Sequence, residues 1–402
     1  MERNNTSKYS REFEIIFFIM TILLLGICSV YFLYKFINPS LVYILTVFVL
    51  LMFFSIKDIS LERKSFIYLC IATLIGFGAL YFNGSGFGYV MLLIFPMFTI
   101  CILFKISINK DFCNFLGILA LCTWGLGVIA STNYTESYIN LLMSGKSMEG
   151  LNPNMVALTL GATYWHIKGW ILRGRFKKAI KFLSVIGLSL VTFSCIVLCR
   201  SRTSLAALLV VVIFDMFFGK RICLSKKLAS VAYWGIIVAG ILLPFGYVFI
   251  WKNTLLGSMS ILGKNIFTGR QIIWINLFEY MKQNPKTIWI GTGYNTDFYI
   301  KKSFNLHNSY MQIFAEFGII VFLIYFLFLF YVLSMAYKGG KISQNKRNYL
   351  MMGFFLLIVG YTETILINGT TLIFLVLSFG LLASQESWEE NHVIKKNRKP
   401  YL

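Results

Sequence analysis

The sequence predicts an all-α protein, a polytopic transmembrane helical bundle of about 12 spans with one large extracytoplasmic loop. Of its 402 residues, 58% are hydrophobic and 13% are charged, which is too few charges for a soluble globular chain. Apolar runs of about 20 residues recur along the chain, and each is long enough as a helix to cross a hydrocarbon core of about 30 Å. Runs such as Ile319 to Leu333 are continuously apolar, which excludes the alternating pattern of barrel strands.

The apolar runs define the predicted spans in order along the chain. The first run, Phe13 to Tyr34, has no small-residue cleavage site and precedes further spans, so we expect an uncleaved helix and not a signal peptide. The predicted spans are 13–34, 37–56, 65–82, 88–106, 112–132, 152–170, 180–199, 203–219, 229–251, 309–336, 349–367 and 370–385.

The spans divide the chain into three predicted regions. Residues 1–251 form spans one to nine of the bundle. Residues 252–308 form the large extracytoplasmic loop, which is polar and is expected to be catalytic. Residues 309–402 form the last three spans and a basic cytoplasmic tail.

The positions of lysine and arginine predict the orientation. With the N terminus inside, most of the 37 basic residues fall in the cytoplasmic loops, whereas the outer loops around Asn83 and Asn368 have none. An even number of spans then places both termini in the cytoplasm. The formal net charge of +21 is therefore largely a topology signal, so we expect contact with the lipid bilayer and no nucleic-acid partner.

No motif predicts a metal ion or another cofactor. The 8 cysteines lie in or beside predicted helices and do not pair in an outer loop. No Asp-x-Asp pair occurs on the predicted outer face, where a metal-dependent transfer would need carboxylates. The turn from Gly291 to Tyr294 is too short for a dinucleotide fingerprint, so we expect a tight turn or a close backbone approach there.

A few basic residues fall on the predicted outer face, against the positive-inside pattern. Arg200 and Arg202 lie in a very short turn between two apolar helices. A charge at a membrane boundary indicates a functional site, although an arginine can also extend harmlessly to the interface. We therefore expect these two arginines to bind something outside the cell membrane.

Arg270 is a third such cation, at the start of a predicted amphipathic helix. Apolar residues at 273, 274, 277, 278 and 281 recur at helical spacing, and Asn284-Pro285 ends the pattern. The helix dipole disfavours a cation in the first turn, so helix stability does not explain Arg270. The alternative is an exposed arginine near a helix cap.

His307 directly precedes the tenth predicted span. A histidine in this position often serves only as a cap or an interfacial residue. However, His166 and His392 fall on the predicted cytoplasmic side, so His307 is the one histidine available as a base near pH 7 for chemistry outside. Glu279 and Asp297 are the competing bases.

Three further polar residues lie near predicted outer helix ends. Asn154 follows Asn152, a predicted N-cap, and its amide is able to bind sugar hydroxyls. Glu316 and Glu363 lie near the outer ends of spans ten and eleven, and we expect them to face the bundle interior.

These motifs share one order and one predicted side of the membrane. They are Ser201-Arg202-Thr203-Ser204, Gly269-Arg270 with Trp274, Asn284-Pro285, Gly291-Thr292-Gly293, His307-Asn308-Ser309-Tyr310 and Glu316-Phe317-Gly318. Together, over roughly 200–320, they resemble the O-antigen ligase and Wzy polysaccharide repeat-unit polymerase superfamily. The resemblance implies a GT-C-like fold in the bacterial cytoplasmic (inner) membrane. It also implies a glycosyltransferase that acts on oligosaccharides linked to undecaprenyl diphosphate and needs no nucleotide sugar or metal.

The resemblance also implies residue roles. His307 would activate the acceptor hydroxyl, and Arg270 with Arg202 would stabilise the diphosphate, with the choice between Arg200 and Arg202 open. The expected substrate-binding residues are Arg200, Asn308, Tyr294, Gln271, Asn154 and Glu279. The expected partners are lipid-linked donor and acceptor oligosaccharides, and a chain-length regulator is a further candidate.

The favoured function is polymerisation of repeat units into capsular, O-antigen or exopolysaccharide. Abundant Lys, Asn and Ile suggest an AT-rich bacterium, and one without an outer membrane would favour a polymerase. The near alternative is an O-antigen ligase, which transfers the glycan to another acceptor. A flippase or transporter is the alternative of a different class, but it should show repeated halves and more charge inside the bundle.

Overall fold

The computed structural model describes most of the chain after residue 86. The described residues are 87–103, 107–108, 110–144, 153–253, 260–261, 264–265, 269–293, 306–367 and 371–386. The first three predicted spans, Asp297 and the predicted substrate-binding residue Tyr294 lie outside these ranges.

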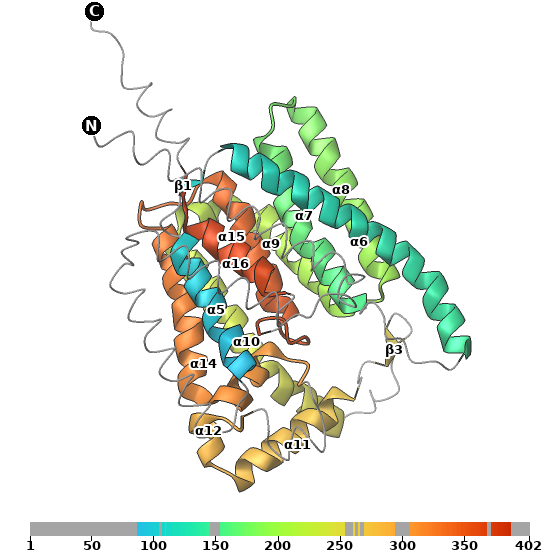
Figure 1. Ribbon diagram of the computed structural model, residues 1–402, viewed down its shortest axis with the longest axis vertical. Helices are drawn as coiled ribbons and strands as arrows, with labels where there is room; N and C mark the ends of the chain where they lie inside the picture. The colour runs from blue at the N-terminus through green and yellow to red at the C-terminus, as the bar shows by residue number, and fades with distance from the viewer. Residues whose placement is uncertain are drawn as a thin grey trace, which may run out of the picture.

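Helices make up nearly all of the described chain (Figure 1). Each predicted span between 88 and 385 coincides with one of them. These helices are α5 Phe87–Leu103, α6 Lys110–Ser144, α7 Pro153–Arg173, α8 Lys178–Leu198, α9 Arg202–Leu224, α10 Lys226–Asn253, α14 Ser309–Ala336, α15 Gln344–Val359 and α16 Leu372–Ala383. The loop between α10 and α14 adds α11 Arg270–Gln283 and α12 Lys286–Ile290.

The strands in the described residues are two residues long and leave the all-helical class unchanged. They are β1 Ser107–Ile108, β2 Ser260–Ile261, β3 Lys264–Asn265 and β4 Gln385–Glu386. β1 pairs with β4 in parallel, and β2 pairs with β3 antiparallel.

Several helices are suited to a membrane. Among the described residues, Lys178–Leu198, Lys226–Lys252 and Ser309–Ala336 are long and apolar enough to cross one. Large apolar side chains such as Phe182 and Met216, exposed by 67% and 73%, cover the outside of the bundle, as expected for contact with lipid. The chain is an integral membrane protein, whereas 12 spans and a GT-C-like topology stay predictions.

The core lies where α15 and α16 pack between the remaining helices (Figure 1). Small residues allow the closest approaches. A Cβ atom at Gly161 of α7 would lie 2.2 Å from the Phe355 ring of α15, and one at Gly353 of α15 would lie 2.7 Å from Ser378 Oγ of α16. These contacts draw the helix axes together, as small residues do in membrane bundles.

One helix ends earlier than predicted, and another is interrupted inside its predicted span; both differences shape the site. The eleventh span is predicted at 349–367, but α15 ends at Val359 and residues 361–367 form turns. α14 is interrupted at Gly318, where φ is +78°. Apolar composition does not reveal either break, because both depend on hydrogen bonds to distant segments.

The helices of the loop between α10 and α14 lie together at one end of the bundle. α11 contacts α10 and α12 contacts α14, and both loop helices lie at the lower end in Figure 1. The loop therefore meets the bundle at α10 and α14.

Candidate functional site

Glu363, in the turn after α15, is the residue at which three predicted site residues meet. Its Oε1 accepts hydrogen bonds from Arg270 Nη2 at 2.9 Å and from Asn154 Nδ2 at 2.8 Å. Its Oε2 lies 4.0 Å from His307 Nδ1. The Glu363 side chain is 12% exposed, so the expectation that this acid faces the interior is confirmed. Its place at the centre of the site was not predicted.

Ser309 holds the turn that carries Glu363. Its hydroxyl donates to Glu363 O at 2.7 Å and accepts from the amides of Ile365 at 2.9 Å and Leu366 at 3.2 Å. Its own amide donates to Gly360 O at 2.8 Å. The first residue of α14 thus replaces the helical hydrogen bonds that α15 would need to continue, which explains where α15 ends.

The start of α9 contacts the same turn. Thr203 Oγ1 and Thr362 Oγ1 are 2.5 Å apart. Arg202, the residue before Thr203, is partly buried, whereas Arg200 is exposed in the preceding turn. The arginine turn and the large loop, which are far apart in sequence, therefore both reach residues 362–363.

The predicted amphipathic helix is confirmed as α11. Arg270 is its first residue, and Gly269 before it has a φ of +85°, which glycine adopts at low cost. Trp274 and Leu277 are fully buried, and Trp274 Nε1 donates to Leu306 O at 2.8 Å. The buried face of α11 thus positions Arg270 and contacts the residue before His307.

Backbone strain occurs at two predicted site residues. Among the non-glycine residues that the structure describes, only Arg200 and His307 have positive φ, at +51° and +50°. Such a conformation costs about 1–3 kcal/mol and persists only where surrounding contacts impose it. Strain at these positions favours a functional role for both turns.

His307 is neutral at physiological pH. Burial lowers the pKa of its imidazole to about 4, and the Arg270 guanidinium contributes to the shift. Glu363, whose Oε2 lies 4.0 Å from Nδ1, acts in the opposite direction, because a nearby anion favours the protonated imidazole. A neutral imidazole is able to accept a proton, as a general base must.

Asn308 has a structural role that the sequence did not indicate. The residue is fully buried, and its side-chain amide donates to Gly240 O at 3.2 Å and Tyr361 O at 2.8 Å. Its Oδ1 caps α14 by accepting from Met311 N at 2.8 Å. Both amide donors are thus used within the protein, and a part in substrate binding stays a prediction.

The remaining predicted substrate-binding residues differ in position. Asn154 is in the first turn of α7 and contacts Glu363 directly. Gln271 is buried in α11, whereas Glu279 is exposed two turns further along that helix. Glu279 has no contact with the Glu363 carboxylate among the hydrogen bonds of the described residues.

The predicted close approach at residues 291–293 is confirmed. A Cβ at Gly291 would lie 2.2 Å from Glu316 O, and one at Gly318 would lie 2.1 Å from Trp289 O. Thr292 N donates to Ala315 O at 2.6 Å. This short segment satisfies the carbonyl groups that the break at Gly318 leaves without helical partners.

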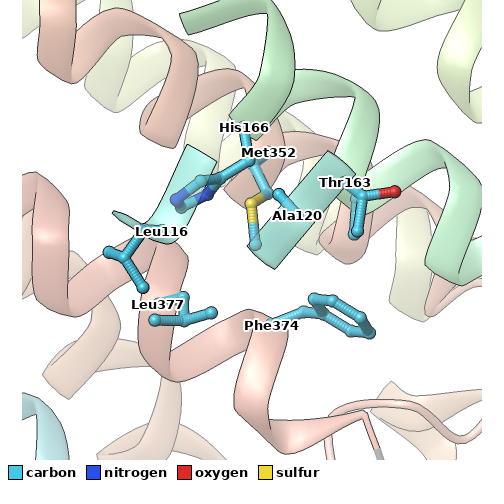
Figure 2. Close-up of a pocket in the computed structure, with 8 residues that line it drawn as sticks. Leu116, Ala120, Thr163, His166, Met352, Phe374 and Leu377 are labelled. Atoms are coloured by element: carbon cyan, nitrogen blue, oxygen red, sulfur yellow. The ribbon is translucent and has the colours of Figure 1, made fainter. Parts of the chain in front are cut away.

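A small cavity between α6, α7, α15 and α16 is separate from this site (Figure 2). Its lining is mostly apolar: Leu116, Ala120, Ala162, Thr163, His166, Met352, Phe374 and Leu377. Its volume of about 10 Å³ leaves room for about one water molecule. It is too small and too apolar to receive a charged lipid-linked sugar. In the part of the chain that the structure describes, no group of three His, Cys, Asp or Glu residues is placed to hold a metal ion.

One feature of the sequence indicated that Glu363 is a candidate functional residue. An ionisable residue between two apolar spans is a functional candidate by default. Glu363 meets that criterion, but its sequence position does not reveal which cation it pairs with.

Comparison with known proteins supports the motif-based resemblance. Residues 187–326 match the Wzy_C family model, described as O-antigen ligase. The match runs from α8 into α14 and includes Arg200, Arg202, Arg270 and His307, whereas Asn154 and Glu363 lie outside it. No curated protein and no solved structure matches the chain.

Proposed function

We propose that this chain, which carries an O-antigen ligase domain at residues 187–326, is a glycosyltransferase that joins oligosaccharides linked to undecaprenyl diphosphate. The family implies lipid-linked glycan substrates in a membrane. One observation carries the proposal: Arg270 and a neutral His307 flank the same buried carboxylate. This arrangement combines a cation for a phosphate leaving group with a base for an acceptor hydroxyl.

In the proposed reaction, an acceptor hydroxyl attacks the anomeric carbon of the donor glycan. The bond from that carbon to the diphosphate oxygen breaks, and the diphosphate keeps the electron pair and gains one negative charge. His307 accepts the hydroxyl proton as the new glycosidic bond forms. The chemistry thus needs charge stabilisation on one side and proton removal on the other.

Glu363 orients both groups in this proposal. The His307 nitrogen Nδ1 carries its proton toward Glu363 Oε2, which leaves the lone pair of Nε2 for the acceptor. The hydrogen bond from Arg270 Nη2 occupies one of the five guanidinium donors, so others are available for phosphate oxygens. Asn154 supports the same carboxylate from α7.

Arg202 is the second cation that we assign to the diphosphate. It precedes Thr203, which contacts the turn that carries Glu363, whereas Arg200 is exposed. The exposed face of α11 then covers the lipid-linked donor on the outer face of the bacterial cytoplasmic membrane. This placement implies cytoplasmic termini, and a chain-length regulator would be an additional partner.

Repeat-unit polymerisation is the preferred activity, and ligation is the second candidate because the matching family model is described as O-antigen ligase. The purified protein in detergent is incubated with one lipid-linked repeat unit, without ATP or added metal. A ladder of longer lipid-linked products indicates a polymerase. Transfer that occurs only after a second type of acceptor is added indicates a ligase. Absence of transfer in both assays would contradict the proposed glycosyltransferase.

A further inference from the structure

Glu316 of α14 is a buried acid that the proposed reaction does not use. The residue is 1% exposed, and its Oε1 accepts a hydrogen bond from Gln312 Nε2 one turn earlier. Its Oε2 has no hydrogen-bond partner among the described residues. Within those residues no basic side chain forms an ion pair with it.

Packing does not explain an acid at this position. A buried polar group with an unsatisfied oxygen costs free energy, and an apolar residue of similar volume is often as stable or more stable. The polar interaction with Gln312 therefore needs a separate explanation.

Gln312 connects Glu316 to the residue before His307. The amide of Leu306 donates to Gln312 Oε1 at 2.8 Å. Since a backbone N–H only donates, Gln312 must direct its oxygen to Leu306 and its NH₂ group to Glu316. Glu316, which accepts from that NH₂ group, therefore keeps the Gln312 amide in the orientation that Leu306 requires.

Leu306 is held at both of its backbone polar groups. Gln312 accepts from its amide, and Trp274 Nε1 donates to its carbonyl at 2.8 Å. On the other side of His307, Asn308 is fixed as the cap of α14. His307 thus lies between two anchored residues, which is the condition for a strained φ of +50° to persist.

We propose that Glu316 is a positioning residue, which acts through Gln312 and Leu306 to hold the His307 imidazole against Glu363. This inference rests on the proposed function, in which His307 is the base. Among the residues that the structure describes, the charged groups that face His307 are Arg270 from α11 and Glu363 from the turn after α15. Without the Glu316 anchor, the imidazole is free to move away from Arg270 and Glu363 and toward water.

The kinetic test compares Glu316→Leu with Glu316→Gln. Leucine removes the acceptor for Gln312, so kcat for glycan transfer should fall on the order of 10- to 10²-fold while KM stays within about twofold. Glutamine keeps a side-chain oxygen at nearly the same volume and should restore most of the rate. Equal losses in the two variants, or a loss expressed mainly in KM, would overturn the positioning role.

Tyr337→Phe is the matched control at the other end of α14. It removes one buried hydrogen bond, from Tyr337 Oη to Ile222 O at 2.6 Å, without touching the site. Its kcat should equal that of the unaltered protein. If Glu316→Leu does not fold, Gln312→Leu breaks the same connection and should show the same loss of kcat.

A titration of His307 separates this inference from the proposed function. Histidine-selective NMR in detergent, with the signal assigned by His307→Gln, measures the imidazole pKa without any substrate. The imidazole pKa should be near 4 in the unaltered protein and should move toward 6.5 in Glu316→Leu and Gln312→Leu, but not in Glu316→Gln or Tyr337→Phe. An unchanged pKa in both leucine variants would contradict the inference. A shifted pKa in a protein that transfers no glycan would instead contradict only the proposed function.

Discussion

Two clusters of charge lie at opposite ends of the same three helices. The Glu363 cluster joins the start of α7 to the turn after α15 through Asn154, and the start of α9 reaches the same turn through Thr203. The Asp215 cluster consists of Asp215 of α9 with Lys168 of α7 and Arg347 of α15. Along α7 the two clusters are about 21 Å apart at a rise of 1.5 Å per residue.

The two clusters differ in how deeply their carboxylates are buried. Asp215 is 1% exposed, with Oδ2 at 2.8 Å from Lys168 Nζ and Oδ1 at 2.5 Å from Arg347 Nε. Arg347 also donates to Asp215 O at 3.2 Å, and its guanidinium lies against Gly219, where a Cβ would approach it to 2.6 Å. This cluster is closed and has the geometry of a structural connection.

The Glu363 cluster combines a carboxylate with an arginine, an asparagine and a histidine, and its carboxylate side chain is 12% exposed. The hydrogen bonds from Arg270 and Asn154 both reach Oε1 of Glu363. The His307 nitrogen Nδ1 lies 4.0 Å from Oε2, and the His307 side chain is 39% exposed. The contrast teaches that the depth of burial distinguishes a structural ion cluster from one that a ligand is able to reach. The following predictions test that distinction.

The largest expected effect is loss of transfer when the base is removed. His307→Gln should lower kcat about 10²- to 10⁴-fold, because the acceptor hydroxyl loses its proton acceptor. His166→Gln is the matched control, since His166 is a buried histidine of α7 outside the site and should leave the rate per folded molecule unchanged. Both variants are assayed by product formation from a lipid-linked repeat unit. Equal rates for His307→Gln and the unaltered protein would remove His307 from the mechanism.

Removal of the two central acids should separate stability from activity. Asp215→Ala leaves Lys168 and Arg347 without their shared anion and should lower the free energy of unfolding by about 3–5 kcal/mol. Its transfer rate per folded molecule should not change. Glu363→Ala should abolish most transfer with a smaller loss of stability, since the Glu363 side chain is 12% exposed and that of Asp215 only 1%.

Denaturant unfolding in detergent and transfer assays on the same samples measure both quantities. If Asp215→Ala abolished transfer in the folded fraction, the Asp215 cluster would be functional as well. If Glu363→Ala were fully active, the Glu363 cluster would not be the site.

The pH dependence should show the lowered pKa of His307. For transfer, kcat/KM should stay nearly constant from pH 7 to 5 and fall about tenfold per pH unit below about 4, where the imidazole becomes protonated. Because the pKa is about 4 when folded and near 6.5 when unfolded, the unfolded chain binds more protons between these values, so stability should also decline as pH falls from 6.5 to 4. A midpoint of activity near 6.5 that is lost in His307→Gln would show that the imidazole is not buried in the working enzyme.

The smallest expected effect concerns the two arginines of the α8–α9 turn. Lysine keeps the charge but loses the bidentate geometry, so Arg202→Lys should reduce kcat/KM about tenfold if Arg202 binds the diphosphate. Arg200→Lys, at the exposed position, should change kcat/KM less than about threefold. The reverse order would assign the diphosphate to Arg200.

The sequence predicts much of the fold because its signals are local. Continuous apolar runs located the nine long helices α5 to α10 and α14 to α16, and helical spacing after Arg270 located α11, whereas the short helix α12 was not predicted. Glycines at 291 and 293 indicated a close backbone approach, since such a contact requires a residue without a side chain. The C-terminal end of α15 and the break in α14 were not predicted, because distant segments impose them. Ser309 binds the turn after α15, and residues 291–293 bind the carbonyl groups at the break in α14.

The features of the site likewise divide into those that the sequence determines and those that depend on the tertiary structure. The sequence by itself determined the membrane class and the candidate residues Arg270, Arg202 and His307. Basic residues that break the positive-inside pattern, and a histidine on the predicted outer face, are recognised from the order of residues alone. Only the tertiary structure decided that Glu363 joins Arg270 to His307 and that Asn308 serves as a cap. A pairing depends on which helix ends meet, and the packing of α7, α9, α14 and α15 determines that meeting.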